Sequence, residues 1–304
     1  MYTTALLDTD TLSLQMRQAF AALTEPKCQH CLHGETYYQL PQTTSIAIGT
    51  FFEEQPVGLL LASLIPTINV IEIHSLFVKE EHRRRKVGTQ MLSALTQYAR
   101  DLQCTFLTII YPQGETTTPY LESLLQSNGW PPPKRFGFTC RFDGSTFNPP
   151  WITREYPLSP DFQLFPWIDL SSKERALLQR KQEQGEIPGP LSPFKDPERI
   201  EPLNSLGLRY NNQVVGWMIT HRIAPDTIRY SALYVLREFQ YRKEAIILLQ
   251  QSIKRQLSSS VRWGELELNI AHVEPSWMTF VQHRLIPYAE SVKYLKQAHC
   301  TLIL

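Results

Sequence analysis

An internal repeat is the feature of this sequence that most limits its fold. Leu76-Phe77-Val78 aligns with Leu233-Tyr234-Val235, and the first residues of the two segments, 76 and 233, are 157 positions apart. The same offset, without a gap, aligns a further set of residues: Arg83 with Gln240, Lys86 with Lys243, Gly88 with Ala245 and Leu92 with Leu249. One spacing that holds across a strand, a loop and a helix indicates duplication of a whole structural unit.

The hydrophobic pattern predicts the same order of elements in both halves. In the first half it predicts strands at 2–7, 44–52, 57–65, 70–78 and 104–111, and helices at 8–23, 87–102 and 119–127. In the second half it predicts strands at 162–170, 206–210, 214–223, 227–235, 263–270, 288–294 and 300–304, and helices at 171–184, 242–257 and 275–283. The expected fold is α/β: two tandem domains, each a mostly antiparallel mixed sheet flanked by helices.

A change in composition marks the expected domain boundary. Residues 143–161 contain several prolines and few aliphatic side chains, as is common between domains. We therefore expect domains at 1–147 and 148–304.

The charge and hydropathy of the chain exclude several classes of protein. Its 30 basic and 29 acidic residues give a formal net charge of +1, which provides no overall attraction to nucleic acid. The longest apolar stretch, Val57–Ile65, is far shorter than the roughly 20 residues of a membrane helix, and the first residues do not resemble a signal peptide. We expect a cytoplasmic protein without nucleic-acid or membrane partners, and the oligomeric state stays open.

Five cysteines in a chain without an export signal are expected to be reduced thiols. Cys28 and Cys31 lie near His30 and His33, so this segment has two interpretations, a metal or redox site or a plain surface loop. A structural zinc site usually needs a second ligand pair at a set distance, and the remaining cysteines stand alone. We therefore expect a surface loop and no metal.

The loop before the helix at 87–102 is the segment with the clearest chemistry. Arg83, Arg84 and Arg85 precede Gly88, which lies at the start of the helix. Free N–H groups at a helix N-terminus favour a phosphate, arginines reach phosphates well, and a glycine allows close approach to the backbone. The segment predicts either a phosphate-bearing ligand or a solvated basic loop.

This segment resembles the GNAT acetyltransferase superfamily. Its motif is a strand ending in Val followed by Gln/Arg-x-x-Gly-x-Gly/Ala at the start of a helix, and Arg83-Arg84-Arg85-Lys86-Val87-Gly88 departs from it only in Lys86, which replaces the first Gly. The resemblance extends over residues 1–142. The three strands expected at 44–52, 57–65 and 70–78 form an antiparallel meander before the loop, a strand follows the α-helix after it, and the next helix ends at Asn128-Gly129-Trp130. The resemblance is weaker over 160–304.

The resemblance implies acetyl-CoA as the cosubstrate. The loop would hold the pyrophosphate through its backbone, and the strand before it would hold the pantetheine arm as an added strand. The residues implied for this role are Leu76, Phe77, Val78, Arg83, Arg84, Arg85, Lys86, Val87, Gly88 and Thr89.

Candidate catalytic residues precede the loop and follow it. Glu72 lies where histone acetyltransferases of the superfamily have a general-base Glu, and it is either the base, a water-positioning group or a structural carboxylate. Strand alternation predicts that Glu72, His74 and Leu76 share one face, with His74 as the second candidate base. The resemblance places a thiolate-protonating Tyr at Leu125, where it is missing, so Tyr120 is the substitute candidate.

The second half is expected to lack the catalytic groups. Glu244 introduces a negative charge where pyrophosphate would lie, and Arg229 is the counterpart of Glu72 at the same offset of 157. The chain is thus expected to be an N-acetyltransferase that transfers an acetyl group from acetyl-CoA directly to the amine of a small molecule or peptide. In this hypothesis, the second half is structural or shapes the substrate site. A non-catalytic CoA-binding or interaction module is the alternative.

Overall fold

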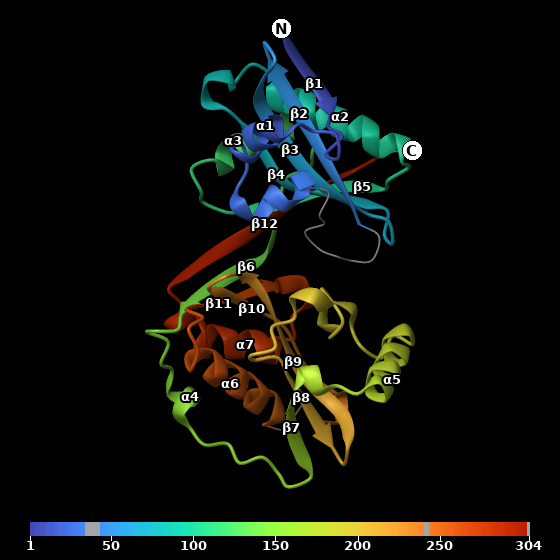
Figure 1. Ribbon diagram of the computed structural model, residues 1–304. Helices are drawn as coiled ribbons and strands as arrows, with labels where there is room; N and C mark the ends of the chain where they lie inside the picture. Colours follow the sequence, from blue (N-terminus) through green and yellow to red (C-terminus); the bar gives the residue numbers. More distant parts are fainter. Residues whose placement is uncertain (34–42, 240–242, 303–304) are drawn as a thin grey trace. The chain divides into compact units, whose positions relative to one another are not determined.

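The computed structural model describes residues 1–33, 43–239 and 243–302. The chain divides into two compact units, and each contains a sheet flanked by helices (Figure 1). Unit 1 comprises Met1–Phe136 and Tyr294–Leu304, and unit 2 comprises Gly137–Lys293. By this division, the expected boundary between residues 147 and 148 lies inside unit 2.

Unit 1 contains a mixed sheet in the strand order β1-β2-β3-β4-β5-β12. Only the β4–β5 pair is parallel. The strands are β1 (Tyr2–Leu6), β2 (Thr44–Phe52), β3 (Gln55–Ile65), β4 (Val70–Val78), β5 (Phe106–Pro112) and β12 (Ser291–Thr301), and the helices are α1 (Leu14–Ala21), α2 (Val87–Asp101) and α3 (Thr118–Ser127), with short 3-10 turns η1 (Pro26–His33) and η2 (Glu80–His82).

Helices cover both faces of this sheet. α2 and α3 bury an apolar stripe against one face, where Met91, Leu95 and Leu125 pack with Ile71 and Ile73 of the sheet. On the opposite face, α1 and η1 cover the sheet, and Phe20 of α1 packs with Leu59 and Leu61 of β3. The continuous apolar run of β3 contributes to both cores, because successive side chains of a strand point to opposite faces.

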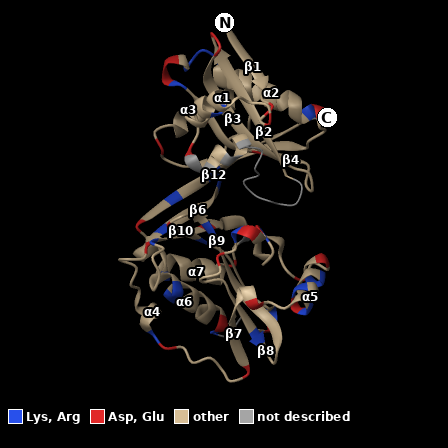
Figure 2. Ribbon diagram, viewed as in Figure 1, with Lys and Arg blue, Asp and Glu red and all other residues tan. Residues whose placement is uncertain are grey.

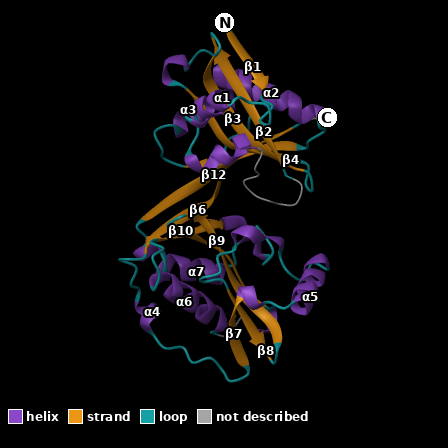
Figure 3. Ribbon diagram, in the orientation of Figure 1, coloured by secondary structure: helices purple, strands orange, loops and turns teal. Residues whose placement is uncertain are grey.

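Unit 2 has the corresponding sheet in the order β7-β8-β9-β10-β11-β6, in which only β10–β11 is parallel. Figure 3 shows the strands and helices of both units. Its strands are β6 (Lys134–Asp143), β7 (Phe162–Pro166), β8 (Leu206–Tyr210), β9 (Gln213–Ala224), β10 (Thr227–Val235) and β11 (Trp263–Asn269), and its helices are α4 (Pro150–Thr153), α5 (Ser172–Glu183), α6 (Glu244–Leu257) and α7 (Pro275–Arg284), with turns η3 (Trp167–Asp169), η4 (Gly189–Leu191), η5 (Pro197–Arg199), η6 (Arg237–Phe239), η7 (Ile270–His272) and η8 (Ile286–Tyr288). This architecture confirms the predicted fold class.

The offset of 157 residues recurs in the structure. It relates the first residues of β4 and β10, of α2 and α6, of β5 and β11, and of α3 and α7. It also relates β6 to β12, since these strands begin at residues 134 and 291. The two equivalent strands are exchanged: β12 from the second repeat pairs with β5 in unit 1, and most of β6 pairs with β11 in unit 2.

Several predicted elements differ from those observed. Strand β6 was not predicted, and the strands expected at 288–294 and 300–304 form one continuous strand, Ser291–Thr301. The first helix begins at Leu14 rather than residue 8, because Ser13 caps it by accepting a hydrogen bond from the Met16 N–H. The third helix ends as expected at Asn128-Gly129, where Gly129 adopts a φ of 81° that suits a helix C-terminus.

One carboxylate in unit 2 connects a helix cap to the sheet, and it provides a stability prediction. Glu174 accepts hydrogen bonds from the Ser171 N–H and, at 2.6 Å, from Nε of Arg209 on β8. The Arg209 guanidinium holds the pKa of Glu174 at about 2, well below its usual value, although burial acts in the opposite direction. Glu174→Ala is expected to lower the free energy of unfolding by about 2 kcal/mol.

This contribution depends on pH with a defined sign. Because the folded-state pKa of Glu174 is depressed, its stabilisation is present above the ordinary value of 4.5 and is lost as pH falls toward 2. Denaturant unfolding at pH 7 and pH 3 should therefore show a smaller difference between wild type and Glu174→Ala at pH 3. The exposed Glu183 of the same helix is the matched control, and Glu183→Ala should change stability by less than about 0.5 kcal/mol. An equal loss at both pH values would contradict the role of the Arg209 ion pair.

Candidate functional site

The candidate site in unit 1 begins where two parallel strands separate. β4 pairs with β5 only from Val70↔Phe106 to Ile73↔Ile109. β4 then continues to Val78 along β3, whereas β5 continues along β12. The sheet therefore forks after Ile73, and the second half of β4 has one edge without a strand partner among the described residues. An extended ligand can hydrogen-bond to such an edge as an added strand.

A β-bulge at the fork redirects the side chains of β4. Along β3, Leu61 pairs with Ser75 and the next residue, Ala62, pairs with Ile73, so His74 is the extra residue. Ile71, Ile73, Leu76 and Val78 all pack on the α2 side. On the α1 side, His74 Nε2 and Ser63 Oγ form a 2.9 Å hydrogen bond, and Thr24 Oγ1 donates to Ser75 Oγ at 3.0 Å. The prediction that Leu76 shares a face with Glu72 and His74 is thus wrong, because alternation does not continue through a bulge.

The backbone orientation of β4 identifies which groups face the open edge. The Lys79 N–H donates to Val57 O on β3, and the C=O and N–H of one peptide plane point in opposite directions, so the Val78 carbonyl points away from β3. Regular pairing from Leu76 to Val78 gives Leu76 the same orientation. Nε of Arg83 donates to the Val78 carbonyl at 3.1 Å. The Phe77 ring is 37% exposed, and its centroid lies 6.0 Å from the Arg83 guanidinium carbon.

The loop after β4 leads to an uncapped helix N-terminus. Lys86, the N-cap residue of α2, has φ 63° and ψ 12°, and no side chain caps the helix. This left-handed conformation is the one that glycine adopts most readily, which accounts for a glycine at this motif position in the family that the loop resembles. Arg84 also has a positive φ, of 59°. The first-turn N–H groups of Val87, Gly88 and Thr89 have no intrahelical acceptor, so they are available to an anion.

The charges around this N-terminus favour an anion. Arg83, Arg84, Arg85 and Lys86 are exposed, and the first turn of α2 contains no acidic residue. The basic loop follows η2, which contains Glu80 and Glu81, and elsewhere in both units acidic and basic residues are interspersed (Figure 2). A positive cluster at the positive end of a helix dipole forms a local anion site in a chain that is nearly neutral overall.

Gly88 has a packing role in the structure. A Cβ on Gly88 would lie 2.9 Å from Cδ2 of Leu124 on α3, so the missing side chain permits close contact between α2 and α3. Gly88 itself is buried. A large substitution at Gly88 would therefore disturb helix packing as well as any ligand, and the exposed arginines are better positions for testing the loop.

The candidate acid–base residues differ in their surroundings. Glu72 and His74 are half-buried near the fork, whereas Tyr120, in the first turn of α3, is 64% exposed. Leu125 is buried in the core.

Sequence reasoning missed Tyr111 on the β5 side of the fork. Its O–H donates to Glu122 Oε1 at 3.2 Å, and Lys296 Nζ donates to the same oxygen at 2.8 Å. Burial raises the pKa of Tyr111 above its usual value, so the hydroxyl keeps its proton at neutral pH. No local pattern identifies this group, because its partners are 11 and 185 residues away and Tyr111 ends an apolar run.

The cysteine segment is a 3-10 turn with a buried side, not the expected surface loop. Cys28 and Cys31 are 3% and 0% exposed and pack with Phe20 and Leu32. Burial raises the pKa of the Cys31 thiol to about 12, so this thiol is protonated at neutral pH. The side chains of His30 and His33 lie outside the described set. Among the described residues, no three His, Cys, Asp or Glu side chains gather as a metal site requires.

Unit 2 repeats the fork with different chemistry. β10 pairs with β11 only from Thr227↔Trp263 to Arg229↔Glu265, and a bulge follows at Ser231. Arg229, the counterpart of Glu72, forms a 3.4 Å ion pair with Glu265. Glu244 lies in the first turn of α6 and is 2% exposed, which places a carboxylate where unit 1 has an open N-terminus. Residues Gln240–Arg242 of the corresponding loop lie outside the described residues.

A His–Ser hydrogen bond lies at the bulge in both units. In unit 1 the His is on the bulged strand β4, whereas in unit 2 the Ser is on the bulged strand β10 and the His is on its neighbour β9. His221 Nδ1 on β9 lies 2.7 Å from Ser231 Oγ on β10, and His221 Nε2 lies 2.9 Å from Lys195 O. Burial lowers the pKa of His221 below its usual value. The imidazole is therefore neutral at pH 7, and it links the bulge residue Ser231 to the backbone carbonyl of Lys195 by hydrogen bonds.

Comparison with known proteins agrees with this geometry. Residues 14–122 match the model of the Acetyltransferase (GNAT) family. No curated protein sequence matches the chain at a significant level. No described helix has both the length and the apolar character needed to cross a membrane.

Solved structures share the fold over the whole chain. A tandem GNAT protein from the clavulanic acid biosynthesis pathway superposes with a TM-score of 0.68 at 14% identity, covering 99% of this chain and 98% of that one. A GCN5-related N-acetyltransferase from Sphaerobacter thermophilus gives 0.63 at 13% identity, covering 100% and 97%. A glucosamine N-acetyltransferase region of a fungal multi-domain GH3 β-N-acetylglucosaminidase gives 0.68 at 11% identity, covering 99% of this chain and 38% of that chain. At these identities the likeness establishes the fold alone.

Proposed function

We propose that the chain, in which residues 14–122 match the Acetyltransferase (GNAT) family model and whose fold is shared with a tandem GNAT protein, is an acetyl-CoA-dependent N-acetyltransferase whose chemistry takes place in unit 1. The observation that carries the proposal is the uncapped, basic N-terminus of α2 beside the forked, half-open strand β4. No other described helix start combines these features with a fork.

In this proposal, the two parts of acetyl-CoA use different parts of the site. The backbone N–H groups from Arg84 to Thr89 bind the pyrophosphate, and Arg83–Lys86 add positive charge around it. Leu76 and Val78 hold the pantetheine arm through the backbone groups that point away from β3, whereas the backbone groups of Phe77 point toward Leu59 of β3. The thioester then reaches the fork near Ile73 and His74.

Glu72 is the proposed base or water-positioning residue. The attacking amine must be neutral, so a proton has to leave it before or during attack. The amine nitrogen then bonds to the acetyl carbon, the carbon–sulfur bond breaks, and CoA leaves as the thiolate. His74 shares the α1 face of β4 with Glu72 and is the second candidate. Its hydrogen bond to Ser63 fixes its ring orientation.

Protonation of the leaving thiolate has two candidate donors. Tyr120 is accessible, whereas the Tyr111 proton is engaged with Glu122. A CoA thiolate is a fair leaving group, so turnover does not require either. The second repeat would then have a structural role, because it supplies strand β12 to the sheet of unit 1.

Thiol release tests the proposal. The full chain is incubated with acetyl-CoA and a panel of small-molecule amines and peptides, and free CoA is measured with a thiol reagent. We expect amine-dependent release on at least one member of the panel. Saturable acetyl-CoA binding with no release on any amine would instead establish the alternative, a non-catalytic CoA-binding module, which the lysine at the motif glycine position favours. Absence of binding at millimolar acetyl-CoA would contradict both.

A further inference from the structure

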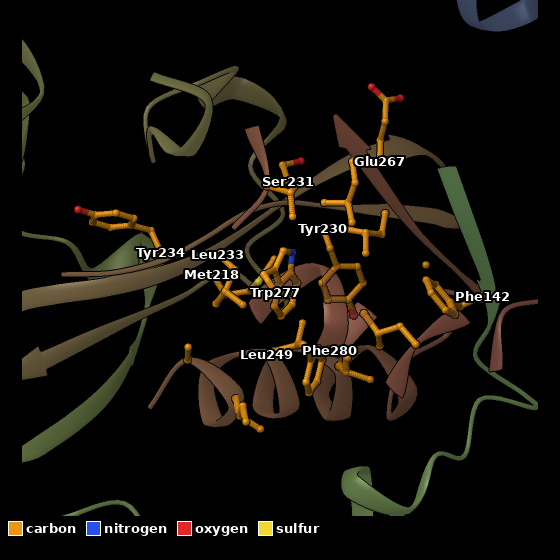
Figure 4. A pocket seen from close by; sticks show the side chains of 18 of the residues that line it. Phe142, Met218, Tyr230, Ser231, Leu233, Tyr234, Leu249, Glu267, Trp277 and Phe280 are labelled. Carbon is orange, nitrogen blue, oxygen red and sulfur yellow. The ribbon is translucent and has the colours of Figure 1, made fainter. Parts of the chain in front are cut away.

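Unit 2 contains a cavity of about 450 Å³ at its own fork. This volume is in the range of sites for drug-sized ligands. The cavity lies where β10 and β11 separate, and α6 and α7 line it. Figure 4 shows Trp277, Phe280 and Tyr230 turned toward this space, with Glu267 at its edge and pointing outward. The fold thus provides a cavity in unit 2 that the acetyl transfer proposed for unit 1 does not use.

The interior of this cavity is apolar. Leu233, Val235 and Leu249 contribute side chains from β10 and α6, and Leu266 and Leu268 come from β11. The buried Tyr230 hydroxyl donates to Gln256 Oε1 at 2.6 Å, so this polar group is already satisfied within the protein. A ligand that fills the interior therefore needs a hydrocarbon or aromatic body rather than many hydrogen-bonding groups.

The charged residues that line the cavity favour a positively charged ligand. Among the described lining residues only Glu267 and Glu274 are ionisable acids, and none is Lys, Arg or His. The Trp277 and Phe280 rings stack with centroids 5.2 Å apart and planes inclined by 10°. Carboxylates and aromatic faces together attract organic cations. The same carboxylates, with Glu244 buried at the start of α6, repel the phosphates of acetyl-CoA.

From these observations we infer that unit 2 binds a hydrophobic amine: a molecule with an apolar or aromatic body inside the cavity and an ammonium group at the edge of the cavity, where Glu267 or Glu274 supplies the carboxylate. The fork that we assign to acetyl-CoA in unit 1 has become, in the second repeat, a site for an apolar cation. This inference goes beyond acetyl transfer and does not depend on it.

Three probes that differ only in their head group test the charge assignment. Calorimetry and tryptophan fluorescence of the full chain would compare 4-phenylbutylamine, 4-phenylbutanol and 4-phenylbutyrate. We expect the amine to bind with a Kd at least about tenfold lower than that of the carboxylate, with the alcohol between them. Equal binding of amine and carboxylate, or binding of none, would overturn the inference.

Variants locate the site. The double variant Glu267→Gln/Glu274→Gln should weaken the amine to the level of the alcohol and leave the alcohol unchanged, whereas Glu183→Gln, an exposed acid outside the cavity, should change neither. Ile246→Trp, which fills the cavity from α6, should abolish binding of the amine and the alcohol. Acetyl-CoA binding, measured on the same variants, reports whether unit 1 remains folded. Loss of amine binding with intact acetyl-CoA binding supports the inference, and amine binding that survives Ile246→Trp overturns it. Competition of acetyl-CoA with the amine for this cavity would also overturn it.

Discussion

Glu72→Gln is expected to lower the turnover rate by about 100-fold near neutral pH, the usual scale for removing a general base. The amide keeps the size and hydrogen-bonding capacity of the side chain but cannot take the proton of the amine. Acetyl-CoA affinity should stay near that of wild type, because the α2 loop is untouched. Steady-state thiol release, together with a binding titration, measures both effects.

The second repeat supplies the matched control. Arg229 occupies the equivalent position on β10, but it is ion-paired with Glu265, so the single change would leave a half-buried carboxylate without its partner. Arg229→Gln/Glu265→Gln removes both charges and should leave turnover within a few-fold of wild type. A dead double variant beside an active Glu72→Gln enzyme would move the chemistry to unit 2.

His74 is the alternative base, and the pH profile separates it from Glu72. If Glu72 takes the proton, the turnover rate of the wild-type enzyme falls at acidic pH, and the turnover rate of Glu72→Gln loses this pH dependence. His74→Gln preserves hydrogen bonding to Ser63 and should keep the acidic limb. Persistence of the limb in Glu72→Gln and its loss in His74→Gln would transfer the role to His74.

Arg85→Glu is expected to weaken acetyl-CoA binding by about 10- to 100-fold. The change replaces a positive charge with a negative one beside the proposed pyrophosphate site. A charge reversal at an exposed position next to a bound anion changes the binding free energy by about 1–3 kcal/mol. Arg85 is exposed, so the fold should be unaffected. The affinity of wild type should also fall as salt is raised, because screening reduces these interactions.

Lys134→Glu changes the net charge by the same amount at another exposed position of unit 1. It should leave the acetyl-CoA Kd within about twofold of wild type. Equal loss in both variants would indicate a general charge effect, and unchanged affinity in a folded Arg85→Glu protein would contradict the loop assignment. Gly88→Glu cannot separate these cases, because Gly88 packs against Leu124.

Much of the fold could be predicted from the sequence because its signals are local or periodic. The offset first seen between Leu76 and Leu233 also relates β5 to β11 and α3 to α7. Helix α2 was predictable from its amphipathic stripe, and the end of α3 was predictable from Gly129. The loop motif pointed to the N-terminus of α2, which is basic and has no side-chain cap.

Other features depend on tertiary contacts that leave no local signal. Strand exchange is one of these, since it depends on the pairing of β6 with β11 and of β12 with β5, and each of these pairs joins strands that lie far apart in the sequence. The bulge at His74 is another, because a shift of one residue moves Leu76 to the opposite face although the composition of β4 does not change. The burial of Cys28 and Cys31 follows from α1 and η1 packing on the sheet, which a polar-looking segment does not indicate.

Hydrogen–deuterium exchange of the full chain, with and without acetyl-CoA, locates the cosubstrate without any substitution. We expect slower exchange at residues 76–78 and 84–89 when acetyl-CoA binds, and unchanged exchange at residues 231–235 and 244–249 of unit 2. Protection confined to the unit 2 segments, or no protection at saturating acetyl-CoA, would contradict acetyl-CoA binding in unit 1.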